Sequence, residues 1–437
     1  MKQSFYGGVH PNDRKELARH KEVAPLSAAP KQVVIAMAMH VGAPCKPIVA
    51  VGDQVKVGQK IGEIAGLGAP IHASVSGVVK AVEPRPYVGG GKVMSVVIEN
   101  DFQDTWGSVL TPHPDYSKLS CEEIVEIVKE AGITGMGGAG FPTAVKLSPK
   151  NLDEIDMLVI NGAECEPYIT SDNRCFIEDT HHVLNGIKQV MKYLNIAKCV
   201  IGIEGNKPEA IAKMKSAIDD PAIEVKTLPC RYPQGAEKVL IETCTGREVP
   251  FPGLPSDVGV IVMNVTSVAF VSKYLETGMP LTTKRLTVDG DIVKQPKNVE
   301  VIIGTPIQEL LDFCGGLTAE PGKILYGGPM MGTCVADLSQ PILKNNNAIL
   351  AFSQERAKLP KASNCIQCGR CVNACPLGLA AKDIVVAFNK GNVELLNQLH
   401  ADLCMSCGTC SFVCPAKRPL TPSIALAKIM MKNGGKK

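Results

Sequence analysis

The sequence predicts a multidomain α/β protein with four parts: a β domain, a parallel α/β domain, a small β-rich domain and a helical module. Residues 33–100 contain short β-like runs separated by Gly and Pro, with no helical period. Strand and helix patterns then alternate from 157 to 228, which indicates a parallel sheet. Near the C-terminus, eight of the 17 cysteines form two identical runs. We place the four domains at residues 1–110, 115–280, 281–350 and 355–437.

The first domain resembles the lipoyl and biotinyl carrier fold, a barrel-like sandwich of short strands. The resemblance lies in Gly52–Gln59 and Ala73–Val79. A carrier domain presents a modified lysine at a hairpin tip, but the intervening Ala65–Pro70 contains no lysine. We therefore expect a structural or docking role rather than a swinging arm. The β-like runs are Val33–Met39, Pro47–Val51, Ser76–Val82 and Met94–Glu99.

A second domain begins near Ser120, where Ser120-x-x-Glu123 predicts a capping box for a helix over Cys121–Ala131. The helix leads into the Gly-rich run 135–143, GMGGAGFPT, which contains the dinucleotide fingerprint G-x-G-x-x-G. That fingerprint follows a strand in dinucleotide-binding folds, whereas this run follows a helix. Small residues still let backbone N–H groups approach a phosphate or a flat ring. On its own, the run is equally compatible with an ordinary Gly-rich turn.

Two loops follow strands in the alternating region. In a parallel sheet, ligands bind beyond the C-terminal ends of the strands. Asn161–Pro167 and Tyr232–Lys238 lie at such ends and carry carboxylates. Taken singly, each carboxylate is more often a loop or cap residue than a ligand contact. We expect strands at Met157–Ile160, Cys199–Ile203 and Ile223–Leu228, and helices at Thr180–Leu194 and Glu209–Ile218.

We expect the third domain to be a structural bridge between the α/β domain and the helical module. Leu286–Val301 is β-like, Pro306–Cys314 has helical spacing, and Ile324–Met331 returns to a strand and turn.

Both C-terminal cysteine runs have the pattern C-x2-C-x2-C-x3-C-P, and they begin at Cys365 and Cys404. This is the signature of a ferredoxin with two [4Fe–4S] clusters, in which the fourth cysteine ligates the other cluster. Zinc sites use separated ligand pairs, so this repeated run fits them poorly. We assign one cluster to Cys365, Cys368, Cys371 and Cys414, and the other to Cys404, Cys407, Cys410 and Cys375.

The spacer between the runs predicts an α-helical ferredoxin module. Leu379–Asn389 and Val393–Leu403 have helical spacing, and a third helix is expected near Pro422–Lys432. The clusters need reduced thiolates, so we expect a reducing compartment.

Composition excludes some function classes. The formal net charge is only +3 and the basic residues are dispersed, so electrostatics gives no reason to expect a nucleic-acid partner. No stretch approaches the ~18 apolar residues of a membrane span, and residues 1–21 show no signal peptide. We therefore expect other subunits to hold the chain at any membrane where it works.

Three motifs resemble the NADH- and FMN-binding subunit of respiratory complex I: Gly135–Lys146, Asn161–Pro167 and Tyr232–Glu237. The whole chain resembles more closely the RnfC family, the C subunits of the Rnf ferredoxin:NAD oxidoreductase complexes. Gly7–Pro11, His40–Pro47, the Gly-rich run and the paired cysteine runs occur in that family's order. The resemblance implies a Rossmann-like flavin domain, and a β-grasp-like domain of the soluble-ligand-binding type as the bridge.

The resemblance also implies non-covalent FMN, with NAD(H) as substrate. No acid or base is needed for hydride transfer at a flavin. Phe141 and Glu166 correspond to nicotinamide contacts. Met136 replaces an Arg and Ala163 replaces an Asp of the complex I pattern, which puts the mode of NAD(H) binding in doubt. The implied FMN positions are Gly135, Gly137, Gly138, Gly140, Lys146, Asn161, Glu164, Tyr232, Gly235, Glu237 and Asn264.

Flavin is the group that couples a two-electron nicotinamide to one-electron clusters. We therefore expect a peripheral subunit of a membrane-bound, ion-translocating ferredoxin:NAD+ oxidoreductase, on the cytoplasmic face of the membrane. Its expected partners are integral membrane subunits and a ferredoxin-like iron–sulfur subunit. Two alternatives remain: a soluble flavin and iron–sulfur reductase such as a cobalamin reductase, and a non-enzymatic electron wire and docking subunit without NAD(H) binding.

Overall fold

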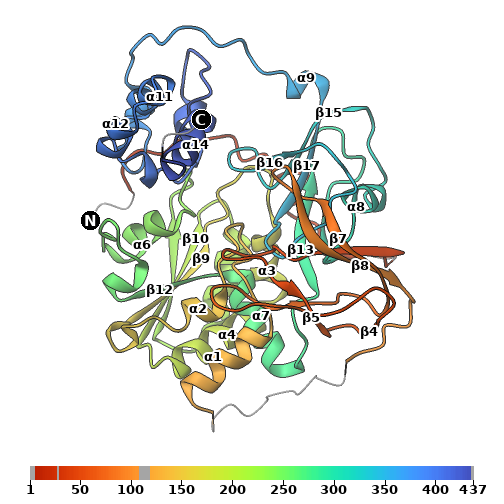
Figure 1. Cartoon of the computed structure of the whole chain (residues 1–437). Coiled ribbons are helices and arrows are strands. Elements are labelled where there is room, and N and C mark those ends of the chain that lie inside the picture. The colour runs from red at the N-terminus through yellow and green to blue at the C-terminus, as the bar shows by residue number, and fades with distance from the viewer. Residues whose placement is uncertain (1–4, 27–28, 108–118, 435–437) are drawn as a thin grey trace.

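The computed structural model describes residues 5–26, 29–107 and 119–434. The chain forms four domains (Figure 1). The predicted boundary between the first two domains, at 110–115, lies outside the described residues. Across the described ranges, no helix is both long and apolar enough to cross a bilayer.

The first domain is a sandwich of two small antiparallel sheets, as the short β-like runs predict. Its four-stranded sheet has the order β2-β8-β7-β4 and its three-stranded sheet the order β3-β5-β6. The bounds are β2 (Gln32–Ala36), β3 (Lys46–Pro47), β4 (Gln54–Val55), β5 (Lys60–Glu63), β6 (Ile71–His72), β7 (Gly77–Pro86) and β8 (Lys92–Asn100).

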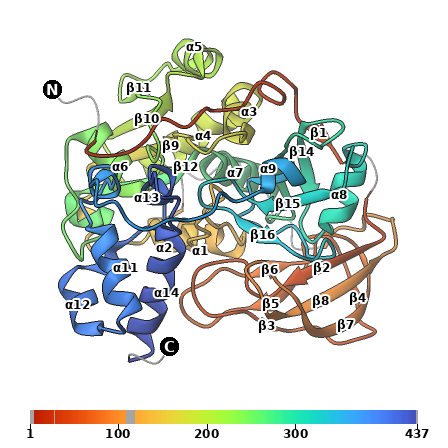
Figure 2. The ribbon, with the colours of Figure 1, turned by 90° about the horizontal axis from the view of Figure 1, so that it is seen from above.

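Residues 5–26 lie outside this sandwich, although the sequence places them in the first domain. They run across the α/β domain toward the third domain (Figure 2). There β1 (Ala24–Pro25) pairs in parallel with β14 (Lys297–Ile302). We name residues 5–26 the N-terminal segment.

The α/β domain contains a four-stranded parallel sheet of order β11-β10-β9-β12. Apolar side chains are buried on both faces of this sheet, under α4 and α7 on one side and α6 on the other. The capping box is confirmed, because Ser120 and Glu123 each accept the other's backbone N–H. The strands are β9 (Met157–Gly162), β10 (Lys198–Glu204), β11 (Ile223–Leu228) and β12 (Val260–Asn264). The helices are α1 (Cys121–Glu130), α2 (Thr143–Lys146), α3 (Ser171–Glu178), α4 (Thr180–Tyr193), α5 (Pro208–Ala217), α6 (Glu237–Thr245) and α7 (Val265–Thr277), with short 3-10 turns at Leu152–Glu154 and Pro255–Val258.

The third domain is a mixed six-stranded sheet of order β1-β14-β13-β17-β15-β16. Its last long strand runs to Ser353, three residues beyond the boundary expected from the sequence. Besides β1 and β14, the elements are β13 (Thr283–Asp289), β15 (Pro321–Tyr326), β16 (Thr333–Val335), β17 (Ala348–Ser353), α8 (Ile307–Phe313) and α9 (Gln354–Ala357).

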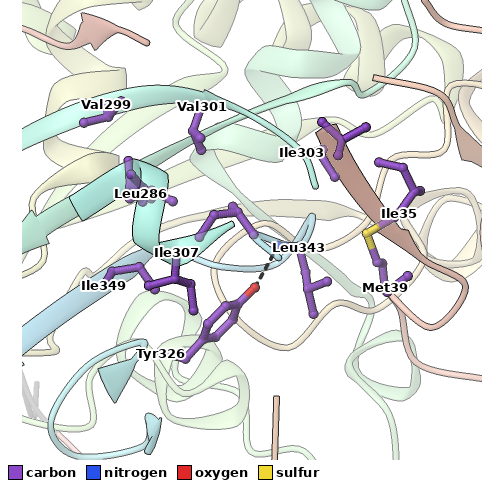
Figure 3. Packing of buried hydrophobic residues seen from close by; sticks show 14 of the residues in the cluster. Ile35, Met39, Leu286, Val299, Val301, Ile303, Ile307, Tyr326, Leu343 and Ile349 are labelled. Atoms are coloured by element: carbon purple, nitrogen blue, oxygen red, sulfur yellow. Dashed lines mark hydrogen bonds between the residues drawn. The ribbon is translucent and has the colours of Figure 1, made fainter. Parts of the chain in front are cut away.

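The first and third domains share one hydrophobic core (Figure 3). Ile35 of the sandwich is fully buried in the same cluster as Leu286 and Ile307 of the third domain. The hydroxyl of Tyr326 accepts the backbone N–H of Leu343 at 2.8 Å inside this core. Burying each such aliphatic side chain contributes about 1.5–3 kcal/mol, so the two domains stabilise each other.

The helical module is internally duplicated. α10 and α13 occupy equivalent places 39 residues apart, and so do the starts of α11 and α14. Equivalent residues also share the left-handed conformation, as in Gln367 and Ser406 and in Gly369 and Gly408. The elements are α10 (Arg370–Asn373), α11 (Ala381–Asn389), α12 (Val393–Gln398), a 3-10 turn at Ala401–Leu403, α13 (Thr409–Phe412) and α14 (Leu420–Lys432).

The crossing of α4 and α7 depends on Gly186. A Cβ atom at this position would lie 2.1 Å from the backbone oxygen of Val268. We expect Gly186→Ala to lower the free energy of unfolding by about 1–3 kcal/mol, because overpacking outweighs the gain in helix propensity. The control is Gly205→Ala, whose Cβ would make only ordinary contacts at 3.6 Å or more. Equal urea midpoints for the two variants would contradict this role of Gly186.

Candidate functional site

Two cavities in the helical module each gather four cysteines. One is lined by Cys365, Cys368 and Cys371 together with Cys414 of the second run. The other is lined by Cys404, Cys407 and Cys410 together with Cys375 of the first run. Four thiols around one cavity are the donor set that a [4Fe–4S] cluster requires. We name these the first-motif cavity and the second-motif cavity, and the crossed sets are those that the sequence predicts.

The second-motif cavity adjoins the α/β domain. The Tyr232 hydroxyl is buried and donates to the backbone oxygen of Cys407 at 2.7 Å. Tyr232 also exchanges two backbone hydrogen bonds with Val9, each 2.8 Å long. The backbone N–H of Gly8 donates to Ala374, beside the ligand position Cys375. The N-terminal segment thus connects the loop after β11 to this cavity.

The two predicted asparagines lie at the C-terminal ends of neighbouring parallel strands. Asn161 is the last but one residue of β9 and Asn264 is the last residue of β12, and the two residues are paired in register. The Asn161 amide donates to the backbone oxygen of Gly235 at 2.9 Å, so it holds the loop after β11. Gly137 lies so close to Asn264 that a Cβ atom would be 2.8 Å from its amide nitrogen. The Gly-rich run therefore packs over the C-terminal ends of two neighbouring strands.

The Gly-rich run leaves its backbone open at one place. Gly138 has a φ of +124°, and no described atom lies within 4 Å of the position of its Cβ. The Asn345 amide of the third domain donates to the Gly138 oxygen at 2.9 Å. Gly140 has a φ of +67° and packs against Asn345, while Gly135 bonds to Phe141 through its backbone. Bare backbone of this kind can approach a phosphate or a flat ring closely, and we name residues 135–141 the cradle.

Three predicted residues meet beside this cradle. The Lys146 ammonium lies 2.5 Å from a Glu237 carboxylate oxygen and 3.1 Å from the Val262 carbonyl oxygen. The same ammonium lies 5.8 Å from the centre of the Phe141 ring. Glu237 is the first residue of α6, and Lys146 is the last of α2. The structure therefore assembles one predicted nicotinamide position and two predicted FMN positions at one place.

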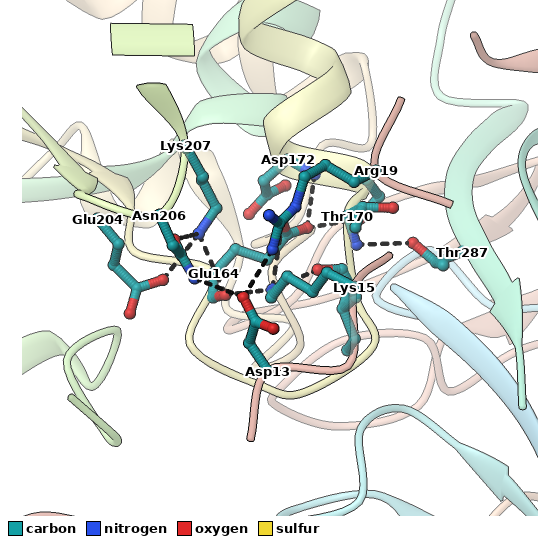
Figure 4. Close-up of polar contacts among 12 residues, drawn as sticks. Asp13, Lys15, Arg19, Glu164, Thr170, Asp172, Glu204, Asn206, Lys207 and Thr287 are labelled. Atoms are coloured by element: carbon teal, nitrogen blue, oxygen red, sulfur yellow. Dashed lines mark hydrogen bonds and ion pairs between the residues drawn. The ribbon is translucent and has the colours of Figure 1, made fainter. Parts of the chain in front are cut away.

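Glu164 is buried among charged groups (Figure 4). One of its carboxylate oxygens accepts the backbone N–H of Asp172 at 2.7 Å, at the start of α3. The other lies 3.8 Å from the Lys15 ammonium of the N-terminal segment. Burial raises the pKa of Glu164 to about 7, and nearby Lys15 opposes that rise. The Glu164 carboxylate is thus hydrogen-bonded to the start of α3 and does not face the cradle directly.

The buried charges extend to a second pair. Lys15 donates to the backbone oxygens of Glu164 and Ile169 at 2.7 and 2.5 Å. Lys207 lies 2.8 Å from Glu204 and is as fully buried as Lys15. Removing one partner of a buried ion pair leaves an uncompensated charge. Lys15 therefore fixes the N-terminal segment against the loop 161–167, and the Lys207–Glu204 pair lies beside it.

Two predicted site residues point away from the cradle. Glu166 accepts the backbone N–H groups of Met330 and Met331 at 3.0 and 2.8 Å, in the third domain. Burial raises its pKa to about 7, against the effect of these two donors. The Tyr232 side chain reaches the helical module, and its place in the FMN pocket stays a prediction. Both side chains join domains, and the nicotinamide role of Glu166 stays a prediction.

Met136 and Gly235 contribute through packing. The Met136 side chain is buried in the core shared by the first and third domains, so it replaces the Arg of complex I without facing the cradle. A Cβ atom at Gly235 would lie 2.3 Å from the Ala163 oxygen, so a glycine is required where the two loops touch.

Sequence reasoning missed Lys15, Asp172 and Asn345. Asp172 accepts the Asn264 amide at 2.8 Å and the Thr266 hydroxyl at 2.9 Å, and so joins α3 to the end of β12. Its place soon after the loop Asn161–Pro167 is the one signal that could have found it. Lys15 and Asn345 come from distant segments, so no local pattern marks them.

The fold and the two kinds of site define a flavin- and iron–sulfur-binding electron-transfer protein. Four family models match the chain in order: the RnfC barrel sandwich hybrid domain at residues 3–103, the Nuo51 FMN-binding domain at 128–273, the SLBB domain at 285–333 and a 4Fe-4S dicluster domain at 361–418. These matches confirm the predicted fold class and the predicted FMN and [4Fe–4S] cofactors.

Curated relatives match over most of the chain. The C subunit of the proton-translocating ferredoxin:NAD(+) oxidoreductase complex of Clostridium ljungdahlii is 45% identical, over 87% of this chain and 83% of the relative. The C subunit of the Na(+)-translocating complex of Acetobacterium woodii is 44% identical, over 97% and 96%. The chain belongs to the family of C subunits of ion-translocating ferredoxin:NAD(+) oxidoreductase complexes, the RnfC family.

A solved structure shares the fold. A chain of the NAD+-reducing [NiFe]-hydrogenase in the H2-reduced state superposes with a TM-score of 0.53 at 17% identity, and the match covers 73% of this chain and 63% of that one. At this identity the likeness concerns the fold alone.

The crossed cysteine sets predict which variants share a phenotype. In anaerobically reconstituted protein, we expect Cys375→Ser to damage the same cluster as Cys407→Ser, and Cys414→Ser the same cluster as Cys368→Ser. Each variant should retain about four of the eight irons that two clusters require. Iron analysis and electron paramagnetic resonance compare the four proteins. A Cys375→Ser spectrum that matches Cys368→Ser would show that each run ligates its own cluster.

The buried ammonium of Lys15 predicts a stability effect. Lys15→Met should lower the free energy of unfolding by about 3 kcal/mol, because the buried Glu164 carboxylate loses its cationic partner. Lys21→Met is the matched control on the same segment, since Lys21 is exposed. In the double variant Lys15→Met/Glu164→Gln, the loss should be smaller than the sum of the single losses. Additive losses in urea denaturation would refute the coupling.

Proposed function

We propose that this chain exchanges hydride between NAD(H) and FMN and passes single electrons through two [4Fe–4S] clusters, as the peripheral subunit of a membrane-bound, ion-translocating ferredoxin:NAD+ oxidoreductase. Its relatives carry the names of such complex subunits. Its partners in this proposal are integral membrane subunits and a ferredoxin-like iron–sulfur subunit, on the cytoplasmic face. The observation that carries the proposal is the contact of Tyr232 with Cys407, which joins the edge of the α/β sheet to a four-cysteine cavity.

The residues at the sheet edge position a flavin in this proposal. FMN, when bound, exchanges electrons in pairs with a nicotinamide and singly with a cluster. Gly138 and its neighbours offer bare backbone to the ligand, and the Asn264 side chain packs against Gly137. Lys146 supplies a cation beside this cradle, with Glu237 holding its ammonium in place. Glu164 supports the cradle indirectly, through the start of α3.

In this proposal, Phe141 is the residue that contacts the nicotinamide. Its ring lies beside the Lys146 ammonium, at the edge of the Gly-rich run. The Glu166 carboxylate already accepts two backbone hydrogen bonds from the third domain, and the Met136 side chain is buried. These two observations favour a second candidate function, an electron wire without NAD(H) binding. The experiment below separates the two.

The cradle predicts the effect of a side chain at Gly138. We expect Gly138→Val to abolish FMN binding and reduction by NADH while both clusters stay intact, because the added side chain enters the open space that the ligand needs. The matched control is Gly66→Val, which has a φ of +99°, no described atom near its Cβ position and a place in the first domain. The measurements are flavin release, iron content and anaerobic bleaching of the visible spectrum by NADH.

The outcomes distinguish the functions. A Gly138→Val protein that still binds FMN stoichiometrically and is bleached by NADH would remove the flavin site from the Gly-rich run. Unaltered protein that binds FMN but is not bleached by NADH would instead support the electron wire.

A further inference from the structure

The two cysteine runs have the same local conformation but different surroundings. In the second run, Met405 packs against the buried cluster of Val9, Tyr232, Ala374 and Cys407. A Cβ atom at Gly408 would lie 2.8 Å from the backbone oxygen of Met330. This face of the module is therefore covered by the α/β domain, the third domain and the N-terminal segment.

Within the part of the chain that the structure describes, the equivalent face of the first run is exposed. Ile366 takes the place of Met405 and is 67% exposed. Cys368 takes the place of Cys407 and is exposed. At Gly369, which replaces Gly408, no atom of the described chain lies within 4 Å of the Cβ position. Val386, 49% exposed, lines the same cavity.

This uncovered face has a basic rim. Between residues 358 and 386 the chain carries Lys358, Lys361, Arg370 and Lys382 but a single acidic residue, Asp383, which pairs with Lys382. Lys417 and Arg418 approach from the second run, because Ser363 bonds to Ala416 at 2.9 Å and Arg418 bonds to Ser363 at 3.3 Å. Lys382 and Arg418 line the cavity itself. An apolar centre within a charged rim is the usual anatomy of a transient protein interface.

We propose that the face formed by Lys361, Ile366, Val386, Lys417 and Arg418 docks an acidic one-electron carrier protein at the first-motif cluster. Opposite charge steers such encounters and is screened by salt. In each encounter one electron passes between the carrier and the cluster, so one is oxidised as the other is reduced and no co-reactant is needed. This inference rests on the proposed function. It adds the place where electrons pass between this chain and its partner, and the charge of the partner's surface.

The test compares two charge reversals in the full-length holoprotein. Lys361→Glu/Lys417→Glu changes the rim without altering a residue that lines the cavity. Lys213→Glu/Lys215→Glu makes the same charge change at exposed sites on α5, which lies far from the helical module (Figure 2). The probe is a plant-type [2Fe–2S] ferredoxin of acidic surface, reduced beforehand and mixed anaerobically with oxidised protein in a stopped-flow spectrometer. Isothermal titration calorimetry measures its binding independently of electron transfer.

At low ionic strength, the rim variant should show a rate constant and an affinity about tenfold lower than those of the control, because steering is lost. The difference should disappear at 1 M salt, where the Debye length is about 3 Å. Identical rates and affinities in the two variants, with equal iron contents, would overturn the proposal. No nicotinamide takes part, so a failure of NADH to bleach the flavin would contradict the proposed function and leave this result unaffected.

Discussion

The N-terminal segment is the constraint on which the arrangement of the domains depends. Electron transfer between bound groups weakens steeply with distance, so an electron-transfer protein must hold its α/β domain and its helical module together. Gly8 and Val9 bond to the helical module and to Tyr232, and Lys15 is buried beside Glu164. β1 then pairs with β14 in the third domain. One continuous stretch of chain thus restrains three domains.

Two different interactions keep this arrangement specific. The core shared by the first and third domains supplies non-directional stabilisation, because it removes apolar side chains such as Ile35 and Leu286 from water. The buried pair of Lys15 with Glu164 is directional, because a shift of the segment would leave these charges unpaired. The first interaction favours compact packing, and the second selects the position of the N-terminal segment.

The duplicated module shows how one local pattern acquires two roles. Met405 and Ile366 hold equivalent places, yet Met405 packs under the α/β domain while Ile366 faces solvent. The difference comes from what lies against each run rather than from the cysteine spacing. A covered cavity and an exposed one give the module a direction, because the second-motif cavity faces the α/β domain and the first-motif cavity faces solvent.

The sequence by itself determined the parts of this protein, because their signals are local. The cysteine spacing predicted the crossed thiol sets, the Ser120 capping box predicted α1, and strand–helix alternation predicted the parallel sheet with Asn161 at a strand end. The family resemblance added Asn264. Tertiary structure alone decided which side chains serve the site. Lys15 lies 149 residues from Glu164 along the chain, and Tyr232 and Glu166 reach other domains instead of the cradle. Such contacts depend on how separate domains pack together, and a periodicity within one segment carries no information about them.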